Sequence, residues 1–93
     1  MNMSFGEQLR KLRVKAKVSP YSLASLAGSD GGYIKRLENG ERRRTMRNTV
    51  LRLGQALLNS SGDITLEDID RLLKAAGYGP LPRNRVSIVE LKR

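Results

Sequence analysis

The chain has 93 residues, the length of one small domain, and contains no cysteine or histidine, which excludes disulfides, thiol chemistry and the usual zinc ligands. Charged residues make up 29% and apolar residues 39% of the sequence, which excludes a disordered chain and suits a folded soluble domain. The 18 basic and 9 acidic side chains give a net charge of +9 at pH 7, which favours a polyanionic partner, either nucleic acid or an anionic membrane surface.

The first predicted helix begins after Ser4, whose hydroxyl can cap it. Glu7 follows three residues later, where its carboxylate can complete a capping box. Basic side chains cover one face of this helix. Arg10 on that face is expected to contact a phosphate, and a merely solvated face is the alternative. The apolar face consists of Phe5, Leu9, Leu12 and Ala16 at helical spacing.

A short helix is predicted over residues 20–27. Ser19 can cap it, and Pro20 suits the first helical position, where no backbone hydrogen bond is lost. Gly28 follows directly and permits the left-handed conformation that ends many helices. The residues expected to face the core are Leu23 and Leu26.

The next predicted helix is capped by Ser29 or Asp30 and runs to about Glu38. Asn39 and Gly40 end it, since both tolerate a positive φ. Its inward residues are expected to be Ile34 and Leu37.

Two further helices are predicted in the second half of the chain. One starts near Thr45, and the other opens at Thr65 with Asp68 three residues later and ends at Gly77. The expected buried faces are Met46, Val50, Leu53 and Leu57 in the first helix, and Leu66, Ile69, Leu73 and Ala76 in the second.

The predicted fold is therefore all-α, with five helices and a short basic tail. Residues 1–79 are expected to form the domain. Residues 80–93 are expected to form a C-terminal tail that is mobile or makes a dimer contact, because Pro80 and Pro82 prevent the last helix from continuing.

The segment 20–40 has the features of two closely crossing helices joined by a tight turn. Ala24 is small enough for a crossing point, Gly28 suits the turn, and Ile34 and Leu37 can wedge the second helix against the first. The stretch LASLAGSDGGYIKRLENGERR resembles the Cro/C1-type, or Xre-type, family of helix-turn-helix transcriptional regulators. The resemblance covers residues 5–58, and it implies a lambda-repressor-like DNA-binding domain whose helix-turn-helix lies at about 20–38.

The resemblance also implies roles for individual residues. The helix over residues 30–38 would enter the major groove, and Arg13 and Glu38 would form a structural ion pair between the first and third helices. The base-facing residues would be Gly31, Gly32, Lys35 and Arg36. Contacts to phosphates or to the minor groove are expected from Arg10, Ser19, Tyr33, Asn39, Arg42, Arg43 and Arg44.

The sequence departs from the family at the positions that usually read DNA. Pro20 stands where a glutamine normally bridges to a phosphate, and the connector after Gly40 lacks its usual proline. Gly31 and Gly32 have two interpretations: they let the backbone approach DNA closely, or they take no part in base recognition. In both cases Lys35 and Arg36 are the best candidates for reading guanine O6 and N7.

The predicted function is sequence-specific binding of double-stranded DNA by a cytoplasmic transcriptional repressor that acts as a homodimer. One alternative is an antitoxin that represses its own operon and binds a cognate toxin, and another is a protein-interaction adaptor with weak DNA specificity. No catalytic group, metal cluster, cofactor motif or membrane-spanning run is visible, so an enzyme and a membrane protein are not expected. Tyr21 and Tyr78 are expected to be packing or surface residues, and Tyr33 has packing as an alternative to phosphate contact.

Overall fold

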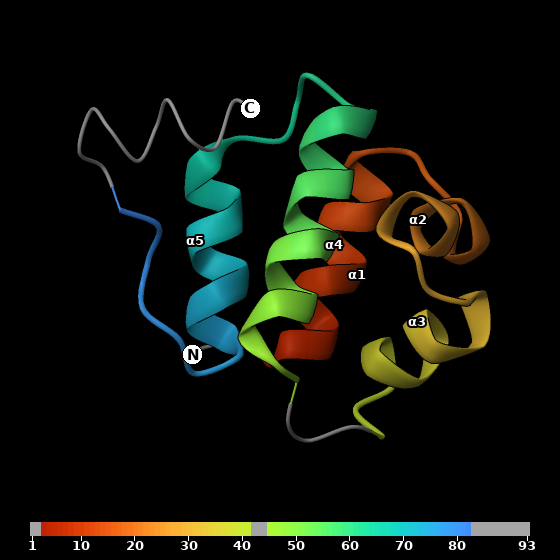
Figure 1. Ribbon diagram of the computed structural model, residues 1–93, viewed down its shortest axis with the longest axis horizontal. Coiled ribbons are helices and arrows are strands. Elements are labelled where there is room, and N and C mark those ends of the chain that lie inside the picture. The colour runs from red at the N-terminus through yellow and green to blue at the C-terminus, as the bar shows by residue number, and fades with distance from the viewer. Residues whose placement is uncertain (1–2, 42–44, 83–93) are drawn as a thin grey trace.

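The computed structural model describes residues 3–41 and 45–82, which form five α-helices and no strand (Figure 1). The expected all-α fold is confirmed, and the helices lie where the sequence places them. Their bounds are Phe5–Lys15 (α1), Pro20–Ala27 (α2), Gly31–Glu38 (α3), Arg47–Ser60 (α4) and Leu66–Ala75 (α5).

Local capping bonds set most of the helix starts. The Ser4 hydroxyl accepts from the backbone N–H of Glu7, whose carboxylate accepts in return from Ser4, so the expected capping box begins α1. The Asp30 carboxylate, rather than Ser29, caps α3, accepting from the backbone N–H three residues later at 2.8 Å. The start of α4 is the exception: it begins after Met46, and no side-chain cap is present there among the described residues.

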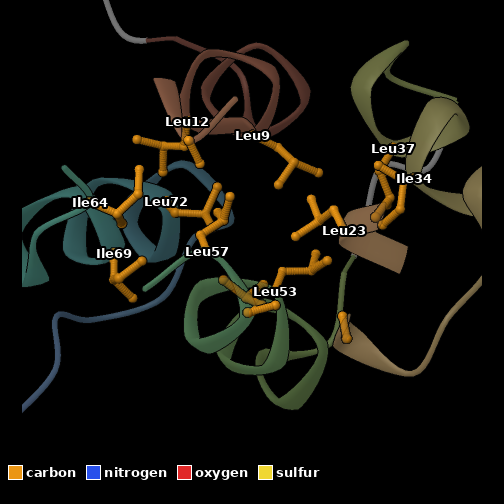
Figure 2. Close-up of a cluster of buried hydrophobic side chains, with 14 of the residues drawn as sticks. Leu9, Leu12, Leu23, Ile34, Leu37, Leu53, Leu57, Ile64, Ile69 and Leu72 are labelled. Atoms are coloured by element: carbon orange, nitrogen blue, oxygen red, sulfur yellow. The ribbon is translucent and has the colours of Figure 1, made fainter. Parts of the chain in front are cut away.

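The core lies between two central helices, α1 and α4, and the elements on either side of them. In Figure 1, α5 lies on one side of α1 and α4, and α2 and α3 lie on the other. Leucine and isoleucine side chains from all five helices meet in the interior (Figure 2). The largest side chains that are at most 2% exposed are Leu9, Leu12, Leu23, Ile34, Leu37, Val50, Leu53, Leu57, Ile69, Leu72 and Leu73.

Two residues expected in the core lie at the surface. Leu26 is 57% exposed, because α2 turns Leu23, Ala24 and Ala27 inward and so directs Leu26 to solvent. Met46 is 71% exposed because it precedes the first turn of α4, so the helical spacing that places Val50 in the core does not apply to it.

A charged cluster joins α5 to α1. The Asp68 carboxylate accepts from the Lys15 ammonium at 2.9 Å and from the Thr65 backbone N–H at 3.0 Å. It also pairs with Arg71 on its own helix at 3.1 Å. Burial alone would raise the pKa of Asp68, but the hydrogen bond from the Thr65 backbone and the interaction with Lys15 outweigh burial and hold this pKa below its ordinary value of 3.8.

The chain packs onto the domain beyond the end of α5. The Tyr78 hydroxyl donates to the Thr45 carbonyl oxygen at 2.6 Å and so ties this segment to the start of α4. Leu81 is buried, and its backbone N–H donates to the Asp70 carboxylate at 2.8 Å. Leu81, in the segment 80–93 that the sequence assigns to the tail, thus packs against the domain. Residues 83–93 of that segment lie outside the described residues, and a mobile or dimer-forming tail remains a prediction.

Candidate nucleic-acid interface

The helix that the sequence assigns to the major groove lies at one end of the molecule. Figure 1 shows α3 at the opposite side of the domain from α5, with α2 beside it. Ile34 and Leu37 are buried against the core, whereas Lys35 and Arg36 are exposed. The residues between the buried positions of α3 therefore present two positive charges to solvent.

A bidentate ion pair holds the C-terminal end of α3 against α1. Arg13 Nε lies 2.6 Å from Glu38 Oε2, and Arg13 Nη2 lies 3.0 Å from Glu38 Oε1, so the expected pair is present. The third nitrogen of the guanidinium group, Arg13 Nη1, donates a hydrogen bond to the Val18 carbonyl oxygen at 3.0 Å. The two side chains are only 15% and 7% exposed, so the pair is largely shielded from water and fixes the position of α3.

Close backbone packing supports the same contact. Gly6 is buried on the side of α1 that meets the end of α3. A Cβ atom at this position would lie 2.7 Å from the Glu38 carbonyl oxygen and would also collide with the Leu37 carbonyl oxygen. The absence of a side chain at Gly6 therefore lets the backbones of α1 and α3 approach.

An aromatic side chain from α2 covers the start of α3. Gly31 is buried, because the aromatic ring of Tyr21 on α2 lies directly over it. The Tyr21 hydroxyl accepts a hydrogen bond from Lys35 Nζ at 3.0 Å, and the same nitrogen lies 4.9 Å from the centre of the ring. The Tyr21 ring therefore covers the surface of Gly31. Both interpretations of Gly31, a close backbone approach to DNA and no part in base recognition, remain predictions.

The second glycine has a different environment. Gly32 is half-buried, and a Cβ atom there would lie 3.2 Å from the Asp30 carboxylate and 3.4 Å from Arg36 Nη1. The Arg36 guanidinium thus reaches back along α3 toward its N-terminal end. The side chains next to the two glycines are therefore those of Tyr21, Asp30 and Arg36.

Three of the residues expected to contact phosphates are exposed, and a fourth is half-buried. Ser19 is exposed at the start of α2, where its hydroxyl caps the helix by accepting from the Ser22 N–H at 3.0 Å. Asn39 is exposed at the end of α3, and Arg10 is exposed on α1. Tyr33 is half-buried, packs against the core and lines an open groove of about 520 Å³ between the α2–α3 turn and α4. The phosphate contacts of these residues remain predictions.

The expected phosphate or minor-groove contacts of the basic connector, Arg42, Arg43 and Arg44, fall outside the described residues.

None of the helices in residues 3–41 and 45–82 has the length and apolar character needed to cross a membrane.

Comparison with known proteins agrees with this geometry. The helix-turn-helix domain family matches residues 4–63, which contain α1 to α4. The chain belongs to the helix-turn-helix family, of the Cro/C1 (Xre) type. The HTH-type transcriptional repressor RghR of Bacillus subtilis (strain 168) is 43% identical over 54 residues, a segment that covers 58% of this chain and 40% of that repressor. The chain thus spans less than half the length of this relative, and no solved structure matches it significantly.

The helix-turn-helix unit contains one candidate residue that the sequence interpretation did not assign to DNA. Tyr21 was expected to be a packing or surface residue, and its ring does both, because it covers Gly31 of α3 while the residue is 61% exposed. The signal in the sequence is Gly31: a glycine at the start of a helix indicates that something approaches closely, although the sequence does not say what.

Proposed function

We propose that the chain is a DNA-binding transcriptional regulator that inserts α3 into the major groove and acts as a repressor. One observation carries the proposal: α3 is fixed to the domain through Ile34, Leu37 and the Arg13–Glu38 pair, while Lys35 and Arg36 remain exposed. A helix that is rigidly attached on one side and cationic on the other has the form required to enter a duplex groove. The similarity to a transcriptional repressor supports repression as the outcome.

The charge of the chain predicts how this binding depends on salt. With a net charge of +9, much of the affinity should come from phosphate contacts that release counterions. Lys35 and Arg36 are the side chains that we assign to base edges, with guanine O6 and N7 as acceptors. The proposed activity is therefore binding with modest sequence discrimination, without a chemical step or a cofactor.

We also propose that the chain binds as a homodimer to a two-fold symmetric site. Helix-turn-helix dimers place two recognition helices about one turn of DNA apart, so the symmetry of the protein matches that of the site. We assign the contact to α5, which lies away from the α2–α3 unit (Figure 1), or to the C-terminal tail. Analytical ultracentrifugation of the free chain and of its complex with a selected duplex tests this, and a monomer in both samples would refute it.

Selection of bound sequences from a random pool of DNA duplexes tests the main proposal. We expect enrichment of a motif with two-fold symmetry, and a steep loss of affinity as salt is added in fluorescence anisotropy titrations. Absence of tight binding to any duplex at low salt would contradict DNA binding and favour a protein-interaction adaptor.

Single substitutions then separate base reading from general attraction. Lys35→Ala or Arg36→Ala should relax the preference at one base pair, because each removes a donor to a base edge. Lys11→Ala, which removes one exposed charge from α1, is the matched control and should weaken binding to all duplexes by a small, equal factor. The assignment would be contradicted if Lys11→Ala lost the base-pair preference. It would also be contradicted if Lys35→Ala and Arg36→Ala both kept that preference.

A further inference from the structure

We propose that Tyr21 reads DNA together with α3, and that its ring contacts the C5 methyl group of thymine in the major groove. This inference rests on the proposed function, because it assigns a specificity-determining residue to the same surface. It also explains why a helix proposed to read DNA has a glycine at its first position.

The position of the ring carries the first part of the argument. A Cβ atom at Gly31 would collide with the Tyr21 ring and would lie 2.9 Å from its Cγ atom. The ring therefore occupies the space that a side chain at the first position of α3 would fill. A residue of α2 thus provides the surface that α3 lacks at its N-terminal end.

The orientation of the ring carries the second part. Tyr21 is 61% exposed, so the ring covers Gly31 with one part of its surface and presents the remainder to solvent. Lys35 Nζ restrains it from the next turn of α3 through the 3.0 Å hydrogen bond and the 4.9 Å approach to the ring centre. Tyr21 and Lys35 therefore form one unit, in which an apolar ring lies beside an ammonium group.

The chemistry of this unit identifies what it would recognise. The thymine methyl is the apolar group that the major groove presents, and apolar side chains recognise it by contact. The ammonium of Lys35 keeps two further N–H donors, which suit a guanine or a phosphate oxygen near the methyl. The unit therefore fits a site in which a thymine lies beside such an acceptor.

The test uses the duplex that the wild-type chain selects from the random pool. Each thymine is replaced in turn by uracil, which removes only the methyl group, and affinity is measured by fluorescence anisotropy at constant salt. We expect that uracil at one position in each half-site lowers the affinity of the protein for the duplex about 4-fold. This factor corresponds to the loss of one buried methyl group. A selected motif without thymine, or equal affinity for every uracil duplex, would overturn the proposal.

Four variants identify the residue responsible, each checked for folding by circular dichroism. Tyr21→Ala should bind the thymine and uracil duplexes equally, whereas Tyr21→Phe keeps the ring and should keep the preference. Gly31→Ala should displace the ring and lose the preference, but it should have no further effect on preference when combined with Tyr21→Ala. A preference that survives in Tyr21→Ala would overturn the assignment.

Other outcomes separate this inference from the proposed function. If Tyr21→Phe weakens binding to all duplexes alike and uracil has no effect, the hydroxyl contacts a phosphate and the methyl contact is refuted. If the wild-type chain binds no duplex at all, the proposed function fails and this inference fails with it. Tight binding that is insensitive to uracil refutes the inference and leaves the proposed function intact.

Discussion

Replacement of Arg13 by methionine should remove a large part of the stability of the domain. The substitution leaves the Glu38 carboxylate, whose side chain is 7% exposed, without a positive partner, and it removes the donor to the Val18 carbonyl oxygen. Breaking a buried pair on one side costs about 3–5 kcal/mol. Because Arg13 is 15% exposed and water can reach the vacated space, we expect the lower end, about 3 kcal/mol.

The double variant Arg13→Met/Glu38→Leu separates the ion pair from simple packing. Apolar residues of similar volume can replace a buried pair at little net cost. The remaining cost is then that of the Val18 carbonyl oxygen without its hydrogen bond, about 1 kcal/mol of unfolding free energy. The double variant should therefore be more stable than Arg13→Met alone.

Urea unfolding followed by far-UV circular dichroism measures these free energies, provided that the m-value stays constant among the variants. Arg10→Met on the exposed side of α1 is the control, and it should change the unfolding free energy by less than about 0.5 kcal/mol. A loss of less than about 1 kcal/mol in Arg13→Met, or a double variant less stable than both single variants, would refute the reasoning.

Three further predictions concern the packing of the helices. Gly6→Ala should lower the free energy of unfolding by about 1–3 kcal/mol in the same urea assay, because the new methyl group meets backbone carbonyl oxygens that cannot rotate away. Gly62→Ala is its control, since no described atom lies within 4 Å of a Cβ there, and an equal loss in both would contradict the packing argument. Asp68 has a lowered pKa in the folded state, so its contribution to stability is present above pH 3.8 and is lost as the pH falls through the folded value. Asp68→Asn should therefore flatten the acid side of the stability–pH curve, and an unchanged slope would refute this. Tyr78→Phe should cost about 1–2 kcal/mol through loss of the hydrogen bond to Thr45, measured by thermal unfolding, and an unchanged Tm would show that the bond is not stabilising.

The helix boundaries could be predicted because they depend on short-range interactions. A capping side chain accepts from a backbone N–H three residues away, so both partners are visible in one short stretch of sequence. Gly28 ends α2 with φ +70°, a conformation that glycine adopts without strain. The starts of α1, α2, α3 and α5 all follow such local signals: Ser4, Ser19, Asp30 and Thr65.

The side of a short helix that becomes buried was harder to predict. In α2, periodicity favours Leu23 and Leu26 equally, and only the neighbouring helices decide that Leu26 faces solvent. Leu81 lies between Pro80 and Pro82, which end the helical pattern and indicate a tail, yet the Asp70 carboxylate and the core hold Leu81 against the domain. Such outcomes depend on partners that are distant in sequence.

The sequence by itself determined that the described part of the chain forms five helices, that the chain is strongly basic, and that α3 buries Ile34 and Leu37 while exposing Lys35 and Arg36. Only the tertiary structure decided what lies at the start of α3, where the Tyr21 ring covers Gly31. The physical reason is the range of the interactions. Capping bonds and dihedral preferences act within about four residues, whereas the ring reaches the glycine only after α2 and α3 have packed together.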